Sequence, residues 1–70
     1  MYITLTNATP QHRGNKIAIN VECVATVHNS TITREDGVIE DVTFVFCPPH
    51  GTWEVSEPLS EVVMMLNELA

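Results

Sequence analysis

The pair Asp36-Gly37 lies between two runs of β-branched residues and constrains the fold of this chain more than any other feature. Glycine adopts positive φ angles without steric cost, and an Asp-Gly pair flanked by strand-forming residues is typical of a β-hairpin. The flanking segments read STITRE and VIEDVTFVFC. We therefore expect a long hairpin with a core strand over residues 42–47. Its outer part, within residues 29–41, is polar and acidic with little to bury, so we expect it to project as a loop or arm.

Alternating apolar and polar residues predict further strands on both sides of this hairpin. Residues 2–6 alternate, and the alternation resumes over residues 16–28. Within that stretch Asn20 is expected to mark a kink or tight turn, because asparagine tolerates the backbone angles of turns. The segment CPPHG at 47–51 predicts a second turn, followed by a short strand at 52–55.

The C-terminal segment has the pattern of an amphipathic helix. Ser56 is expected to cap it, and Pro58 is tolerated in its first turn. An apolar stripe at helical spacing follows, formed by Leu59, Val62, Val63, Leu66 and Leu69. Residues 1–70 are thus predicted to form a single α+β domain, a small antiparallel four- to five-stranded meander sheet covered on one face by a C-terminal helix.

The charge of the chain argues against direct nucleic-acid binding. Nine carboxylates against three basic side chains give a formal net charge of -6, which repels phosphate backbones. The N-terminus lacks a basic, apolar targeting segment, and no apolar stretch approaches the roughly 20 residues needed to cross a bilayer. We therefore expect no membrane association and a cytoplasmic protein in which Cys23 and Cys47 remain reduced and buried.

Cys47 and His50 form the pair in this chain that most suggests chemistry. Zinc needs about four ligands, and Cys23, His12 and His28 show no paired spacing with the pair. Catalysis by a cysteine and a histidine would also need a third group or an oxyanion donor, and none is evident. The turn alone accounts for the two prolines between them. We therefore expect no enzyme activity, no catalytic residue, no metal and no cofactor, and a metal-binding or Cys/His protein is the least favoured hypothesis.

Two groups of residues are candidates for a protein interface. Trp53 in a short strand is either a core residue or, if exposed beside His50, an interface hot spot. The hairpin carries four carboxylates, which could bind a divalent cation or imitate a phosphate backbone. Alternatively, they only form the solvent-exposed end of the hairpin. These residues are Glu35, Asp36, Glu40 and Asp41.

Two stretches, IAINVECVATV at 17–27 and VSEPLSEVVMML at 55–66, resemble the hallmark stretches of the small FlbD-type proteins of bacteria. The matching positions are Asn20, Glu22, Val24 and Val27 in the first and Val55, Glu57, Leu59, Glu61, Val62 and Val63 in the second. The chain departs from the family pattern at Pro58, where serine is usual, and in an insertion over 29–41. The family is associated with flagellar and swarming functions, and this chain looks closer to similar short proteins of tailed bacteriophages. The resemblance implies no catalytic residue.

The first hypothesis for function is a non-enzymatic protein-binding or assembly module. It would be a homo-oligomer that also binds a host protein, encoded by a bacteriophage and acting in the bacterial cytoplasm. A small sheet covered by one helix leaves a face and an edge open for such contacts. The alternative is an acidic inhibitor that occupies a host enzyme's nucleotide or nucleic-acid site by imitating phosphate charge.

Overall fold

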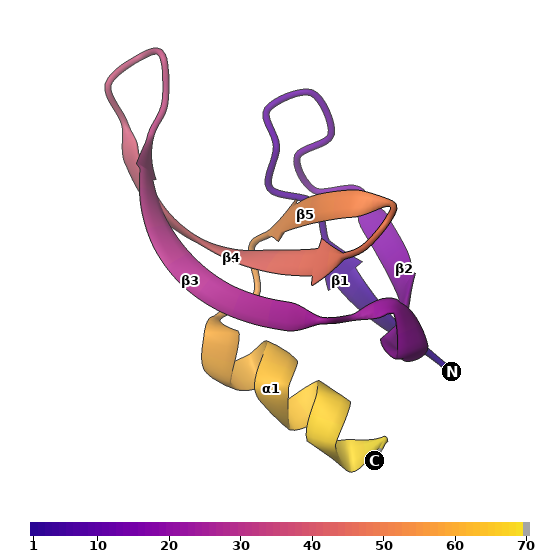
Figure 1. The fold of residues 1–70 in the computed structure, drawn as a ribbon. Coiled ribbons are helices and arrows are strands. Elements are labelled where there is room, and N and C mark those ends of the chain that lie inside the picture. Colours follow the sequence, from indigo (N-terminus) through magenta and orange to yellow (C-terminus); the bar gives the residue numbers. More distant parts are fainter. Residues whose placement is uncertain (70) are drawn as a thin grey trace.

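Residues 1–69 of the 70-residue chain are described by the computed structural model. They form five strands, one turn of 3-10 helix and one α-helix, in the order β1 (Tyr2–Thr6), β2 (Lys16–Asn20), η1 (Val21–Cys23), β3 (Thr26–Thr33), β4 (Ile39–Cys47), β5 (Gly51–Val55) and α1 (Leu59–Glu68). The fold is α+β, with a two-stranded antiparallel sheet β1–β2 and a three-stranded antiparallel sheet β3–β4–β5 (Figure 1).

The single meander sheet expected from the sequence is wrong, because the chain leaves the sheet between β2 and β3. The side-chain Oδ1 of Asn20 accepts a hydrogen bond from the Glu22 backbone N–H at 3.1 Å, which caps η1 where a hairpin turn would otherwise form. The predicted turn at Asn20 is confirmed, but β3 then pairs with β4 and not with β2. The two sheets are joined at one end, by an isolated antiparallel bridge between Asn7 and Val55.

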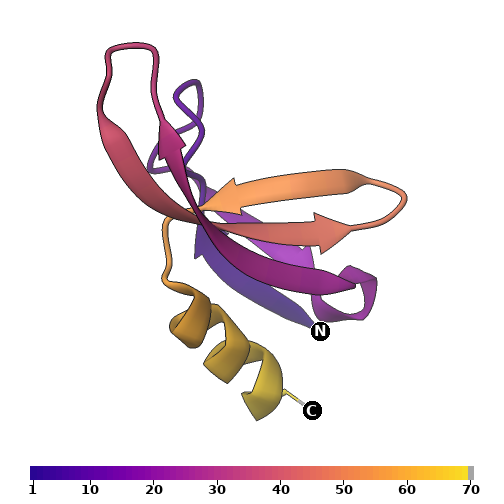
Figure 2. The same ribbon diagram turned by 60° about the vertical axis from the view of Figure 1, so that its left-hand side comes forward.

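The core lies between the two sheets and under the helix. Its members are at most 5% exposed: Ile3, Leu5 and Ile19 from the first sheet, Val45, Cys47 and Val55 from the second, and Val62 from α1. Figure 2 shows β1 and β5 close together at one end and separating toward the β4–β5 turn. The sheets therefore enclose a core at their joined end and diverge at the other.

The turn of the β3–β4 hairpin is the one predicted at Asp36-Gly37. Gly37 has a φ of 86°, and the Asp36 Oδ1 accepts a hydrogen bond from the Val38 backbone N–H at 3.0 Å. Strand pairing runs from Thr33 opposite Ile39 down the whole of β3. The hairpin extends away from the two sheets in Figures 1 and 2, and the molecule measures 39 × 21 × 20 Å.

The helix entry differs from the sequence prediction. Ser56 does not cap α1: Pro58 occupies the cap position, and no side chain bonds the first turn. The Ser56 backbone N–H instead donates to the Thr6 carbonyl at 2.9 Å. The carboxylate of Glu57 accepts hydrogen bonds from the Thr6 backbone N–H at 2.8 Å and from its Oγ1 at 2.9 Å. Ser56 and Glu57 therefore hydrogen-bond to the end of β1 and do not cap the helix, which begins at Leu59.

Helix α1 packs against β3 through a narrower stripe than expected (Figure 1). Val62 is completely buried, and Leu66 and Leu69, one and two turns further on, are half-buried. Val63, which was expected in the stripe, is 38% exposed because it lies to one side of this line. The helix thus covers one end of the core and leaves much of the second sheet uncovered.

Candidate functional site

The β4–β5 turn brings Cys47 and His50 together by backbone geometry. The His50 backbone N–H donates to the Cys47 carbonyl at 2.8 Å, and Gly51 has a φ of 122°, a conformation that side-chain-bearing residues rarely adopt. Cys47 is only 2% exposed. Burial, and secondarily the neighbouring Cys23, raises the pKa of the Cys47 thiol, so this thiol stays protonated and unreactive. Both cysteines are free thiols; Cys47 is buried as predicted, whereas Cys23 is only half-buried, so its predicted burial is wrong.

Trp53 lies on the inner face of β5 but reaches the surface. It pairs directly with Val45 across the strands, so the two side chains share the face on which Val45 and Val55 are completely buried. Trp53 nevertheless remains 38% exposed. Val45 lies on the central strand β4, whereas Trp53 lies on the edge strand β5, which separates from β1 toward the β4–β5 turn (Figure 2).

The divergence leaves a groove between the sheets, which we call the inter-sheet groove. It has a volume of about 360 Å³ and is lined by residues 17–20 of β2 together with Tyr2, Cys23, Cys47, His50 and Trp53. His50 and Trp53, the two candidates from the β4–β5 segment, therefore line one concave surface. The sequence did not indicate Tyr2 as a member, because its contact with the groove depends on how the two sheets are placed.

The lining of the inter-sheet groove is apolar and aromatic, with a few neutral polar groups. It contains the only Trp and the only Tyr of the chain. No carboxylate, lysine or arginine lines it. Concave surfaces with aromatic walls and few polar groups are the usual form of binding sites in proteins.

In residues 1–69 no three His, Cys, Asp or Glu side chains are arranged to hold a metal ion. No helix among these residues is long and apolar enough to cross a membrane.

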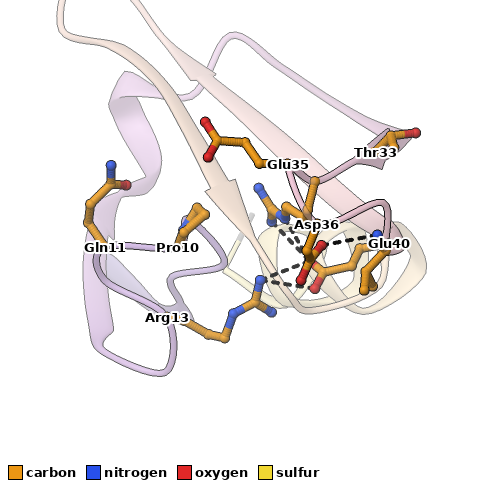
Figure 3. Close-up of a pocket in the computed structure, with 9 residues that line it drawn as sticks. Pro10, Gln11, Arg13, Thr33, Glu35, Asp36 and Glu40 are labelled. Atoms are coloured by element: carbon orange, nitrogen blue, oxygen red, sulfur yellow. Dashed lines mark hydrogen bonds and ion pairs between the residues drawn. The ribbon is translucent and has the colours of Figure 1, made fainter.

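The acidic hairpin candidates do not form one uncompensated cluster. Glu40 makes ion pairs with Arg13 and Arg34, each at 2.9 Å, and hydrogen bonds from Arg13 and then Arg34 lower the pKa of its carboxyl group. The carboxylate of Asp36 closes the hairpin turn through Val38. Asp41 Oδ1 accepts a hydrogen bond from the Thr31 hydroxyl at 2.9 Å. Glu35 is exposed at the rim of a wide cleft of about 750 Å³ beside the hairpin tip (Figure 3).

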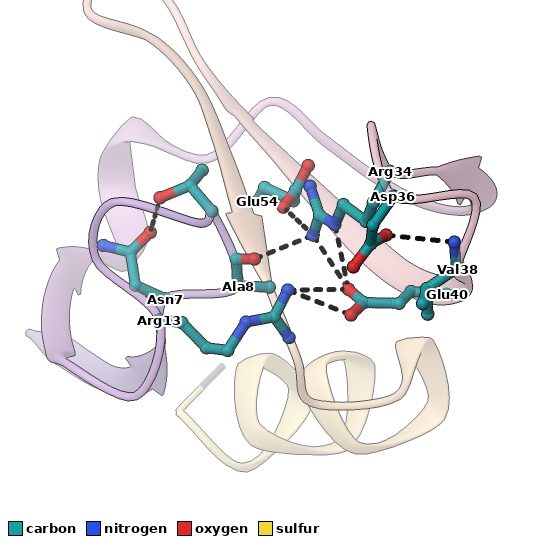
Figure 4. Close-up of polar contacts among 9 residues, drawn as sticks. Asn7, Ala8, Arg13, Arg34, Asp36, Val38, Glu40 and Glu54 are labelled. Atoms are coloured by element: carbon teal, nitrogen blue, oxygen red, sulfur yellow. Dashed lines mark hydrogen bonds and ion pairs between the residues drawn. The ribbon is translucent and has the colours of Figure 1, made fainter.

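Arg34 connects the β3–β4 hairpin to other segments through hydrogen bonds and ion pairs. Its guanidinium donates to the Ala8 carbonyl at 2.8 Å and pairs with Glu54 of β5 at 2.8 Å as well as with Glu40. Hydrogen bonding to Glu54 is the main cause that raises the pKa of Arg34. Figure 4 shows Arg34 and Arg13 converging on the Glu40 carboxylate from the hairpin and from the β1–β2 loop. The network joins three segments, and its role is structural.

The opposite face of the three-stranded sheet carries a second aromatic group. His28 and Phe44 stack with ring centroids 5.3 Å apart and planes inclined by 29°. Phe46, two residues along β4, is 40% exposed. By strand alternation these side chains lie on the face away from Trp53, so they do not belong to the inter-sheet groove.

Comparisons with known protein families, with curated proteins and with solved structures find no match for this chain. The resemblance of residues 17–27 and 55–66 to the FlbD-type family therefore stays a prediction. The inference about function depends on the geometry of the chain itself.

Proposed function

We propose that this chain is a non-enzymatic protein-binding module and that the inter-sheet groove is its binding site. The observation that supports this is the exposure of Trp53, which is 38% accessible although its strand partner Val45 is completely buried. Leaving a large aromatic side chain in contact with water forgoes hydrophobic stabilisation that a partner can supply. Tryptophan and tyrosine are also the residues that most often dominate binding energy at protein interfaces.

The size and edges of the groove favour a protein segment as its occupant. Its volume of about 360 Å³ lies at the lower end for ligand sites, so it suits one or two side chains better than a large cofactor. Four consecutive residues of β2 line it, and β2 pairs with β1 alone among the described strands. An extended segment can therefore add beside β2 with main-chain hydrogen bonds while one of its side chains enters the groove.

Imitation of phosphate charge by the hairpin is a weaker proposal. Glu40 is compensated by two arginines, and Asp36 and Asp41 accept hydrogen bonds from within the hairpin. A surface that imitates a phosphate backbone needs carboxylates that are free to pair with the cations of a partner. We propose a bacterial setting, which the FlbD-type resemblance suggests, with a protein of the host cell as the partner.

Selection from a library of random twelve-residue peptides tests the proposal. Peptides enriched on the folded protein should bind a Phe46→Ala variant equally well and a Trp53→Ala variant much more weakly. Phe46 is the matched control because its exposure, 40%, is close to the 38% of Trp53 and its side chain lies on the other face of the same sheet. Circular dichroism verifies that both variants are folded. The proposal is wrong if the selection yields no peptide whose binding depends on Trp53.

A further inference from the structure

We propose that the inter-sheet groove takes a cationic side chain, an arginine or lysine of the partner segment, against the face of Trp53. This inference rests on the proposed function and names the chemistry of the partner. It follows from the charge balance of residues 1–69 and from the lining of the groove.

Two of the three basic side chains of the protein are in ion pairs, and the third, Lys16, donates only to a neutral hydroxyl. Arg34 is paired with Glu40 and Glu54, and Arg13 is paired with Glu40. The ammonium group of Lys16 donates to the Thr6 hydroxyl at 2.7 Å. Only two of the nine carboxylates are in ion pairs within the described residues, so the remaining surface charge is almost entirely negative. Such a field attracts basic segments and repels acidic ones.

The groove itself recognises a cation through the face of Trp53. No carboxylate lines it, so an incoming cation would not form an ion pair there. Tryptophan binds cations through its π face better than the other aromatic residues, and Trp53 lines the groove. The aliphatic part of an arginine or lysine would at the same time pack on the apolar β2 residues 17–19.

The same charge balance argues against a second copy of the chain as the occupant. Two of the three basic residues of the protein, Arg13 and Arg34, are in intramolecular ion pairs, so Lys16 is the one basic side chain without an ion pair in the described structure. A second copy also carries the same net charge of -6. The occupant is therefore inferred to be a basic segment of a different protein.

Three capped peptides that are identical except at their central residue test the inference. The central residue is arginine, citrulline, which has nearly the same shape without the charge, or norleucine, which is apolar. Fluorescence of Trp53, the only tryptophan, reports binding directly in the groove. We expect the arginine peptide to bind at least about fivefold more tightly than the other two, and this preference should decrease as salt is added. Phe46→Ala should leave this preference unchanged.

Equal or tighter binding of the citrulline or norleucine peptide, or no binding of the arginine peptide, would overturn the inference. The library selection separates this failure from failure of the proposed function. If selected peptides depend on Trp53 but contain no enrichment of arginine or lysine, the groove is a binding site without a preference for cations. If no selected peptide depends on Trp53, both proposals are wrong.

Discussion

Replacing Val62 or Val63 by alanine tests how α1 packs on the core, and the two positions form a matched pair. They are adjacent in the same helix and lose the same atoms, yet Val62 is 0% exposed and Val63 is 38% exposed. Alanine has the higher helix propensity, by about 0.5 kcal/mol, at either position. The difference between the two variants therefore isolates the contribution of burial to the free energy of unfolding.

The expected magnitude follows from the buried atoms. Removing two methyl groups from Val62 loses about 0.8 kcal/mol each, and the cavity left behind raises the total to about 2 kcal/mol. At Val63 the loss of partial burial and the gain in helix propensity nearly cancel, to within about 0.5 kcal/mol. A domain of this size has a total stability of about 4 to 10 kcal/mol. Val62→Ala should consequently be the far more destabilising change.

Chemical and thermal denaturation, each followed by circular dichroism, measure both effects. We expect the midpoint of thermal unfolding to fall by about 8 to 15 °C for Val62→Ala and to change by only a few degrees for Val63→Ala. Equal losses at the two positions would refute the packing of α1 through the line of Val62, Leu66 and Leu69, and with it the explanation for the exposed Val63.

Three further predictions concern ionisation, thiol reactivity and assembly. The pKa of Glu40 is lowered in the folded state, so its ion pairs stabilise the protein above its unfolded pKa of about 4.3 and are lost as the pH falls through the lower folded value. Glu40→Gln should therefore reduce the dependence of the unfolding free energy on pH between about 6 and 3. Glu35→Gln is the control, and the same pH dependence in both variants would contradict the pairing of Glu40. In a thiol-reagent assay on the native protein, Cys23, which is half-buried, should react before Cys47, which is 2% exposed and has a raised thiol pKa; simultaneous rapid reaction of both would contradict this order. Self-association, expected because small domains often need a partner, should appear in light scattering as a mass above that of the 7.8 kDa chain. It should persist in Trp53→Ala, since we propose that the groove binds a different protein. A monomer mass at micromolar concentration would refute it.

The local features of the fold were predictable from the sequence because short-range geometry decides them. The Asp36-Gly37 turn needs one residue with positive φ, and Gly37 supplies it. The alternation that predicted β1 is confirmed by the burial of Ile3 and Leu5. Asn20 was correctly expected to turn the chain, but its cap starts η1, and β3 does not pair with β2. The Asp36-Gly37 turn predicts the pairing of β3 with β4 and gives no information on whether β2 joins the same sheet.

The groove was predictable only in part. The sequence identified His50 and Trp53 as residues whose exposure would matter, and the strand pairing places Trp53 on the same face as Val55. Its exposure results from the divergence of two sheets that are joined at one end, which no pattern within β5 encodes. The pairing of Arg34 with Glu40 could have been inferred from the hairpin register, since the Arg34 backbone N–H donates to the Val38 carbonyl. The long-range partner of Arg34, Glu54, could not.

The central claim is that binding occurs in the inter-sheet groove at Trp53. The most direct measurement is the NMR signal of its indole Nε1–H, the only such signal of the chain, during titration with the tightest peptide selected from the library. We predict that this signal shifts and reaches saturation together with signals of Tyr2 and His50, while those of Phe46 stay constant. A peptide that binds and shifts signals of Phe46 or Glu35 but leaves Trp53 unchanged would contradict the claim.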